Sequence, residues 1–70
     1  MSTPAEKNAK VLAVLQAEQK PIVPTEIARR INEPWCCNDG FAMSAPITPV
    51  LRRIGAIRHK GGLYTKPEAA

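Results

Sequence analysis

Residues 44–66 read SAPITPVLRRIGAIRHKGGLYTK, and this stretch decides the fold that the sequence predicts. Its first half carries the strongest helical period in the chain, with apolar residues at i, i+3, i+4 and i+7: Ile47, Val50, Leu51 and Ile54. The pattern predicts a helix over residues 44–54, with Gly55 as its C-terminal cap. Pro49 lies inside this helix, so we expect either a kink or a shorter helix that Thr48 caps.

The second half of the stretch predicts a β-hairpin, because two short runs of strand-forming residues flank Gly61-Gly62. A two-residue turn sets the pairs Lys60–Leu63, His59–Tyr64 and Arg58–Thr65. Paired residues share one face of a hairpin, so the core face is expected to carry Ile57, His59 and Tyr64. The outward face is then expected to carry Arg58, Lys60 and Thr65.

Two more helices are predicted before this stretch. The first starts at residues 3–6, where Thr3 caps, Pro4 takes the first helical position and Glu6 stands three residues after the cap. It continues to Gln19 and ends before Lys20-Pro21. After an extended connector, the second helix opens at Pro24 or Thr25 and runs to about Asn32. The apolar sides of these elements predict the core: Leu12, Leu15, Ile27, Ile31, Val50, Leu51, Ile54 and Ile57.

The connection between the second and third helices, residues 33–43, has no regular period. It contains two adjacent cysteines, Cys36 and Cys37, followed by a turn signal over residues 38–40. Large apolar side chains are costly to leave in water. We therefore expect Trp35 and Phe41 to fold back onto the core.

The length of 70 residues allows one domain at most, with an ordered core over about residues 4–66 and a short tail over 67–70. So small a core leaves little room for an internal cleft, which disfavours an enzyme, a cofactor or a small-molecule substrate. The sequence has one histidine, no paired carboxylates in a catalytic setting and no phosphate-binding glycine loop. It shows no signal peptide and no membrane span, so a cytoplasmic location is expected.

The charge balance is ten Lys plus Arg against six Asp plus Glu, a net charge of +4. Within residues 51–70 the only acid is Glu68, and the cations there number five: Arg52, Arg53, Arg58, Lys60 and Lys66. A basic C-terminal third indicates a polyanionic partner. The alternative is that these basic residues form an ordinary charged surface that keeps the protein in solution, because such a surface would have the same composition.

Three helices followed by a β-hairpin, with a basic third helix and a basic hairpin, resemble the winged helix-turn-helix family. The resemblance covers about residues 5–66 and rests on TEIARRI (25–31) in the second helix, PVLRRIG (49–55) in the recognition helix and IRHKGGLY (57–64) in the wing. It implies an α+β fold, mostly α, in one winged helix domain over residues 1–70. The chain departs from the family between the second and third helices, which are usually joined by three or four residues.

The resemblance implies DNA binding, with the third helix in the major groove and the wing on the backbone or in the minor groove. Ser44 and Thr48 are expected near base edges, while phosphates are expected to be contacted by Arg52, Arg53, Arg58 and Lys60. The implied function is a small transcriptional regulator that binds double-stranded DNA. A homodimer or a protein partner stays open. A standalone domain of this size is also similar to accessory proteins of phages, plasmids and other mobile elements.

Two other functions are compatible with the sequence. The same fold can serve as a protein-interaction adaptor, here with an apolar patch formed by Trp35, Phe41 and Leu63. The adjacent cysteines can also make the chain a metal or redox sensor. They lack the C-x2-C spacing of zinc sites, and His59 is the only further soft ligand, so no metal site is expected. His59 is expected to be a partly packed strand residue.

Overall fold

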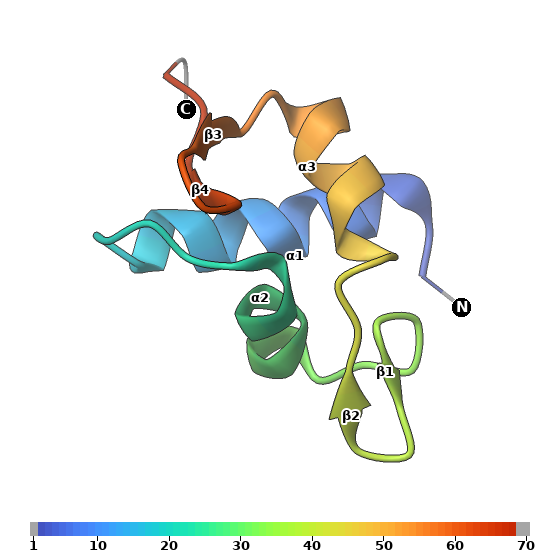
Figure 1. Ribbon diagram of the computed structural model, residues 1–70. Coiled ribbons are helices and arrows are strands. Elements are labelled where there is room, and N and C mark those ends of the chain that lie inside the picture. The colour runs from blue at the N-terminus through green and yellow to red at the C-terminus, as the bar shows by residue number, and fades with distance from the viewer. Residues whose placement is uncertain (1, 69–70) are drawn as a thin grey trace.

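The computed structural model describes residues 2–68 and shows a small α+β domain of three helices and two antiparallel hairpins (Figure 1). Its elements follow one another as α1 (Pro4–Ala17), α2 (Pro24–Ile31), β1 (Cys37–Asn38), β2 (Phe41–Ala42), α3 (Ile47–Ile54), β3 (Ile57–His59) and β4 (Leu63–Thr65). Strands β1 and β2 form one antiparallel hairpin, and β3 and β4 form another. The predicted α+β class, the three helices and the C-terminal hairpin are confirmed. Met1, Ala69 and Ala70, at the ends of the predicted domain, lie outside the described residues.

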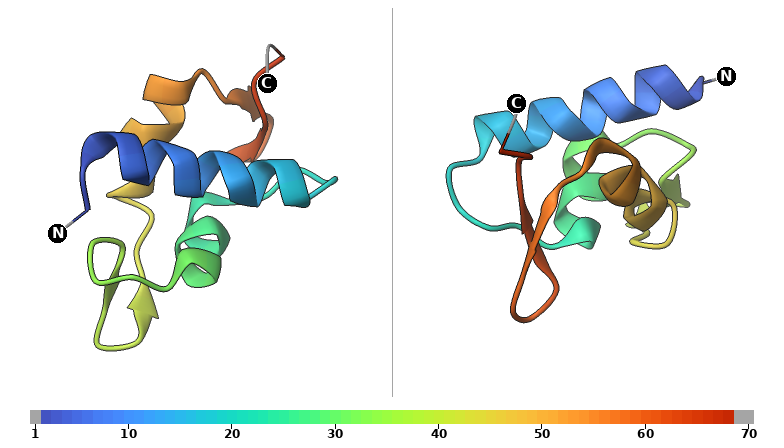
Figure 2. Two further views of the ribbon diagram at one scale, coloured as in Figure 1. Left: turned by 180° about the vertical axis from the view of Figure 1, so that it is seen from behind. Right: turned by 90° about the horizontal axis from the view of Figure 1, so that it is seen from above.

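The two hairpins lie at different ends of the helical part. In Figure 1 the β1–β2 hairpin hangs below α2, whereas the β3–β4 hairpin lies above it, beyond the end of α3. The right panel of Figure 2 shows the β3–β4 loop projecting away from α1. Helix α3 packs against both α1 and α2. Within residues 2–68, no helix is both long enough and apolar enough to cross a membrane.

Helices α1 and α2 begin with similar sequences but are capped differently. At α1 the Thr3 hydroxyl accepts the Glu6 amide N–H at 3.2 Å, and the Glu6 carboxylate accepts the Thr3 N–H at 3.4 Å. This is the predicted capping box. At α2 the cap residue is Val23, which has no side-chain hydrogen bond to offer, although Glu26 stands in the position that Glu6 has in α1. Helix α1 ends two residues earlier than predicted.

Helix α3 is the shorter of the two expected forms, but it starts at Ile47 and its cap residue is Pro46 rather than Thr48. The Ser44 carbonyl closes the preceding turn by accepting the N–H groups of Ile47 at 3.0 Å and Thr48 at 3.1 Å. Pro49 therefore lies in the first turn of the helix. A proline is tolerated there, because the first backbone N–H groups have no partner within the helix. The predicted glycine cap follows the helix at φ 77°.

The β3–β4 hairpin has a different register from the predicted one, and the two-residue turn is wrong. The loop has three residues, Lys60 to Gly62, and the Gly62 N–H donates to the His59 carbonyl at 3.3 Å. Gly61 has φ 87°, which the third position of a type II turn requires. The extra loop residue shifts the pairing to Ile57–Thr65, Arg58–Tyr64 and His59–Leu63.

This shift exchanges the two faces of β3 relative to those of β4. Arg58 shares a face with Tyr64, which packs against the core, so the predicted outward face of Arg58, Lys60 and Thr65 does not form. Ile57 lies on the other face and is 38% exposed, so its predicted burial is also wrong. A one-residue change in register moves every side chain of a strand to the opposite face.

The β3–β4 hairpin is tied to the helical part through the connector between α1 and α2. Ile22, which is buried, pairs with Tyr64 through two backbone hydrogen bonds. The Ile22 N–H donates to the Tyr64 carbonyl at 3.0 Å, and the Tyr64 N–H donates to the Ile22 carbonyl at 2.8 Å. The connector is therefore extended, as predicted, and its residue Ile22 pairs with β4 on the edge of that strand.

The predicted irregular connection contains the β1–β2 hairpin. Its two turn residues, Asp39 and Gly40, have φ 50° and 82°. Positive φ at both positions is the requirement of a type I′ turn, which asparagine, aspartate and glycine meet most easily. The sequence signal at residues 38–40 thus marks the turn of a hairpin.

Trp35 and Phe41 have different surroundings. Trp35 packs against the core, as predicted. Phe41 is 76% exposed, so the prediction that it folds onto the core is wrong. The cause is strand alternation: the Cys37–Ala42 pair packs on the core, and the neighbouring Asn38–Phe41 pair points to the other side.

The core is formed by the facing sides of the three helices, with Ile22 and Cys36. Its buried members are Val11, Leu15, Ile22, Ile27, Ala28, Cys36, Ile47, Val50 and Leu51. Among the predicted core residues, burial is confirmed for Leu15, Ile27, Val50 and Leu51, while the half-buried ones are Leu12, Ile31 and Ile54. Val11 replaces Leu12 because the side of α1 that faces α3 is centred on Val11 and Leu15, one helical turn apart.

Candidate nucleic-acid interface

Helix α3 turns four side chains away from the core. Because Ile47, Val50 and Leu51 are buried, the outward arc contains the remaining positions of the first two turns. At about 100° per residue these positions follow one another around the helix as Thr48, Arg52, Pro49 and Arg53. Thr48 and Arg52 therefore share one edge of the arc, and Pro49 and Arg53 share the other.

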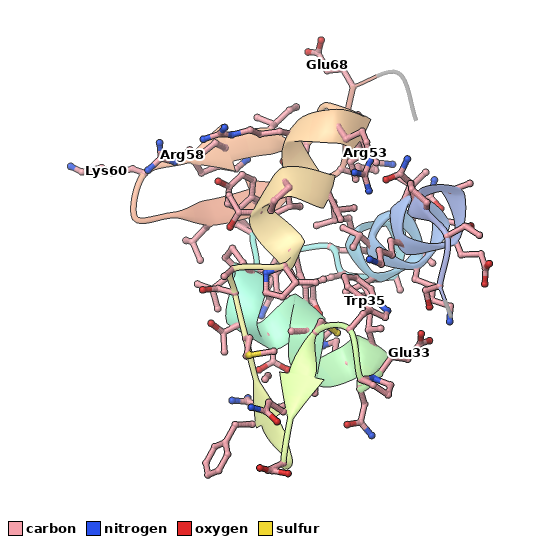
Figure 3. All side chains as sticks on the ribbon, turned by 90° about the vertical axis from the view of Figure 1, so that its right-hand side faces the viewer. Glu33, Trp35, Arg53, Arg58, Lys60 and Glu68 are labelled. Atoms are coloured by element: carbon pink, nitrogen blue, oxygen red, sulfur yellow. The ribbon has the colours of Figure 1, made fainter. Side chains whose placement is uncertain are left out.

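Arg53 lies on the edge next to α1. Its Nε donates to Asn8 Oδ1 at 2.7 Å. Figure 3 shows Arg53 beside α1, with Arg58 and Lys60 on the opposite side of α3. Arg53 thus lies on another side of α3 from Arg58 and Lys60, and it links α3 to α1.

The partner of Arg53 has a signal in the sequence that was missed. Asn8 stands three residues before Val11 and seven before Leu15. The helical spacing that buries Val11 and Leu15 therefore also turns Asn8 toward α3. A polar residue on the apolar side of a short helix is a candidate partner for an arginine of the helix packed against it.

The other edge of α3 carries Thr48 and Arg52, with Ser44 in the turn before the helix. The Thr48 hydroxyl donates to the Ser44 carbonyl at 3.2 Å. A hydroxyl has one donor hydrogen, so Thr48 keeps only acceptor capacity and its methyl group for an outside partner. Ser44 and Arg52 are exposed.

The β3–β4 hairpin carries the remaining two predicted residues. Arg58 extends from β3 and Lys60 begins the loop, and both are exposed. In Figure 3 they lie together at the end of the hairpin, away from α1. His59 is exposed rather than packed, and its Nε2 lies 2.8 Å from Thr65 Oγ1.

Acidic side chains are paired on the α1–α2 side of the molecule. Three glutamates make four ion-pair contacts, Lys10–Glu33, Arg29–Glu26, Arg30–Glu18 and Arg30–Glu26. Hydrogen bonding to Glu18 also raises the pKa of Arg30. Within residues 2–68 no carboxylate lies within 4.0 Å of the cations of the C-terminal third: Arg52, Arg53, Arg58, Lys60 and Lys66. The cations of α3 and of the β3–β4 hairpin thus have no ion-pair partner among the described residues.

The adjacent cysteines belong to the core and its margin. Cys36 is buried and Cys37 is half-buried, and their Sγ atoms lie 3.6 and 3.4 Å from the same acceptor, the Ala28 carbonyl. Burial raises the pKa of the Cys36 thiol. In the part of the chain that the structure describes, no three His, Cys, Asp or Glu side chains come together as a metal site.

Glu33 fastens the start of the connection to α1. Its carboxylate pairs with Lys10, accepts the Trp35 indole N–H at 3.1 Å and accepts the Ser2 hydroxyl at 3.3 Å. The Lys10 hydrogen bond is the main cause that lowers the pKa of Glu33. Lys7 Nζ lies 5.3 Å from the centre of the Trp35 ring. The Trp35 side chain therefore makes its contacts within the fold, with Glu33 and Lys7, and does not form an exposed apolar patch.

Comparisons with known protein families, curated protein sequences and solved structures found no match to this chain. Its function is therefore inferred from the geometry and charge of its own residues.

Proposed function

We propose that this chain is a small DNA-binding protein of the winged helix-turn-helix type that regulates transcription in the cytoplasm, with no catalytic role and no cofactor. The observation that carries the proposal is the separation of charge. Glutamates neutralise cations of α1 and α2, while Arg52, Arg58 and Lys60 have no carboxylate partner within residues 2–68. Lys7 and Lys20 also have no carboxylate partner within residues 2–68, but α3 and the β3–β4 hairpin bring three such cations together. A group of unpaired cations is the electrostatic feature that phosphate binding uses.

The attachment of the β3–β4 hairpin supports its role as a wing. A two-stranded hairpin alone is marginally stable in water. Here the backbone pairing of Tyr64 with Ile22 and the packing of Tyr64 on the core hold the hairpin beside the helices. A wing fixed in this way keeps Arg58 and Lys60 at a constant position relative to α3.

In the proposed complex α3 enters the major groove with the edge that carries Ser44, Thr48 and Arg52. Arg52 contacts a phosphate, and the wing places Arg58 and Lys60 on the backbone or in the minor groove. Because the Thr48 hydroxyl already donates to Ser44, it can only accept from a base. The major-groove donors are the amino groups of adenine and cytosine, and the Thr48 methyl fits against a thymine methyl.

The salt dependence of DNA binding tests the proposal. Each phosphate neutralised contributes about −0.9 to the slope of log affinity against log salt concentration. Contacts from Arg52, Arg58 and Lys60 predict a slope of about −2.7 for a mixed-sequence duplex, measured by fluorescence anisotropy. Arg58→Ala is expected to weaken binding to all sequences alike and to flatten the slope by about 0.9.

Arg52 and Arg53 provide a matched pair of variants. They are adjacent and exposed on one helix, but only Arg52 lies on the edge away from α1. We expect Arg52→Ala to flatten the slope and Arg53→Ala to leave it unchanged while lowering thermal stability. Equal slopes for both variants would contradict the assigned edge. No binding to duplex DNA at low salt and tens of micromolar protein would end the DNA proposal.

The adaptor function is a second candidate, and one observation favours it. Phe41 is the most exposed of the large apolar side chains in residues 2–68, at 76%. Trp35 and Leu63 do not add to a patch, because Trp35 is packed and bonded to Glu33 and Leu63 is half-buried in β4. An apolar contact made by this chain is therefore centred on the β1–β2 hairpin.

A further inference from the structure

The tip of the β1–β2 hairpin presents Phe41 as an isolated aromatic projection. The Cys37–Ala42 pair holds the hairpin on the core, and the Asn38–Phe41 pair points away from it. The type I′ turn at Asp39-Gly40 fixes the direction of both strands. Burying such a ring on association removes a large apolar area from water, and phenylalanine is enriched at the centres of protein interfaces.

The charge around Phe41 favours a protein partner over nucleic acid. Between Arg30 and Arg52 the sequence has no Lys or Arg, and its two charged residues are Glu33 and Asp39. Asp39 stands two residues before Phe41, in the turn. Phosphates are repelled by such a segment, whereas a basic group on a protein surface is attracted to it.

The same chain has a shallow groove whose apolar walls could receive an aromatic ring. It lies between α1 and the end of α2, with a volume of about 270 Å³. Ala13, Val14 and Ile31 supply apolar walls, and Lys10 and Glu33 stand at its edge. Lys10 pairs with Glu33 but has three donor hydrogens, so it can bond a second carboxylate as well.

We propose that Phe41 of one copy inserts into the groove between α1 and α2 of a second copy, where Asp39 meets Lys10. One chain supplies both an aromatic side chain beside an acid and an apolar groove whose edge carries Lys10. Glu33 on the same edge is already held by Lys10, Trp35 and Ser2, and the free donor hydrogens of Lys10 are the groups that Asp39 would meet. The contact joins two different patches, so it assembles copies head to tail unless rotation or reciprocal exchange closes it. The contact area is small, so the association is weak and concentration-dependent.

Sedimentation equilibrium without DNA tests the contact, between about 10 µM and about 1 mM protein. The mean mass is expected to rise above that of one chain as concentration increases. Phe41→Ser removes the projection and Ala13→Arg fills the groove, both at exposed positions. Each is expected to weaken association by about 30-fold or more, as at the centre of an interface. Asp39→Asn keeps a residue suited to positive φ and is expected to weaken association two- to fivefold, by about the value of an exposed ion pair.

Ile57→Thr is the matched control, because it removes another exposed apolar side chain away from the proposed contact and keeps a β-branched strand residue. It should associate like the unmodified chain. Circular dichroism melting confirms that each variant is folded.

Mixing the two defective variants separates this contact from any other. Phe41→Ser keeps an intact groove, and Ala13→Arg keeps an intact projection, so an equimolar mixture is expected to recover a 1:1 complex. No recovery, association that Phe41→Ser leaves unchanged, or a constant monomer mass up to about 1 mM each overturn the proposal. DNA is absent from the assay, so its failure leaves the proposed DNA-binding function standing.

Discussion

The two hairpins are built alike and carry opposite chemistry. Each turns on a glycine with positive φ and pairs its strands over two or three residues. At the tip of β1–β2 stand Asp39 and Phe41, and the loop of β3–β4 carries Lys60, with Arg58 in the adjoining strand. Their attachment also differs, because β1–β2 follows directly from the buried Cys36 whereas β3–β4 depends on the distant Ile22. The two hairpins therefore share a backbone arrangement, and their exposed side chains are what distinguishes them.

Removing the core that both hairpins share should have the largest effect. Leu51 is fully buried in α3, and its carbonyl accepts the Ala56 N–H at 3.0 Å just before β3. Leu51→Ala is expected to lower the free energy of unfolding by about 2–5 kcal/mol. Thermal melting followed by NMR should show both hairpins lost in one transition. Retention of β1–β2 after β3–β4 has melted would contradict the single shared core.

The same substitution, glycine to alanine, made in the turn of each hairpin should show whether the two hairpins have different functions. Nothing lies within 4 Å of a Cβ added at Gly40 or Gly61, so alanine there meets only the strain of positive φ. Each substitution is expected to destabilise its hairpin by about 1–2 kcal/mol. Gly61→Ala should weaken DNA binding, and Gly40→Ala should weaken self-association. If each variant impaired both activities equally, the division of roles between the hairpins would be wrong.

Better capping of α2 should stabilise the helix that packs on β2 and directly follows the connector of Ile22, the anchor of β3–β4. Val23→Ser places a hydroxyl three residues before Glu26 and thereby creates the capping box that Thr3 and Glu6 form in α1. A gain of about 1 kcal/mol is expected from the new cap. Val23 is 39% exposed, so the loss of its partly buried methyl groups offsets a part of this gain. Denaturant unfolding measures the gain, and amide exchange should slow at Ile27 and Asn32, whose N–H groups donate to the carbonyls of Val23 and Ala28.

Acid should loosen the β1–β2 end before the β3–β4 end, with the smallest effect of the series. The pKa of Glu33 lies below its ordinary value, so its contribution to stability is present at neutral pH and is lost as pH falls through the lowered pKa. Glu33→Gln should remove this acid-dependent step. Chemical shifts of the Trp35 indole N–H, followed as pH decreases below about 4.5, provide the measurement. A change of equal midpoint and size at the backbone amide of Leu63, in β4, would count against the assignment to Glu33.

Sequence patterns predicted the parts of the fold that depend on local chemistry. The capping box at Thr3, the glycine cap of α3 and the helical stripe around Leu51 each follow from residues within one or two turns. The register of β3–β4 did not follow, because Gly61-Gly62 satisfies both a two-residue turn and a three-residue loop. Both registers turn Tyr64 toward the core, and they differ in the residue of β3 that pairs with it, His59 in the prediction and Arg58 in the structure.

The sequence predicted the candidate site only in part, because some of its features depend on local patterns and others on contacts between distant residues. Residue type and helical spacing marked Thr48 and Arg52 as outward positions, and the structure places both on one edge of α3. Charge alone could not separate Arg52 from Arg53, since the difference is the Asn8 side chain on another helix. Phe41 was expected inside because it is large and apolar, but strand alternation and its turn determine its exposure.

The Ile22–Tyr64 bridge also has a consequence for the order in which the chain folds. Strands β1 and β2 meet across a turn of two residues, so their pairing closes a very short loop. Bringing Ile22 to Tyr64 closes a loop that contains α2, β1–β2 and α3, and the entropy cost of closure rises with loop length. We therefore expect the β3–β4 hairpin to become ordered last, so that substitutions at Tyr64 accelerate unfolding with little effect on the folding rate. A nascent or partly unfolded chain would then hold its helices together before Arg58 and Lys60 have reached their positions beside them.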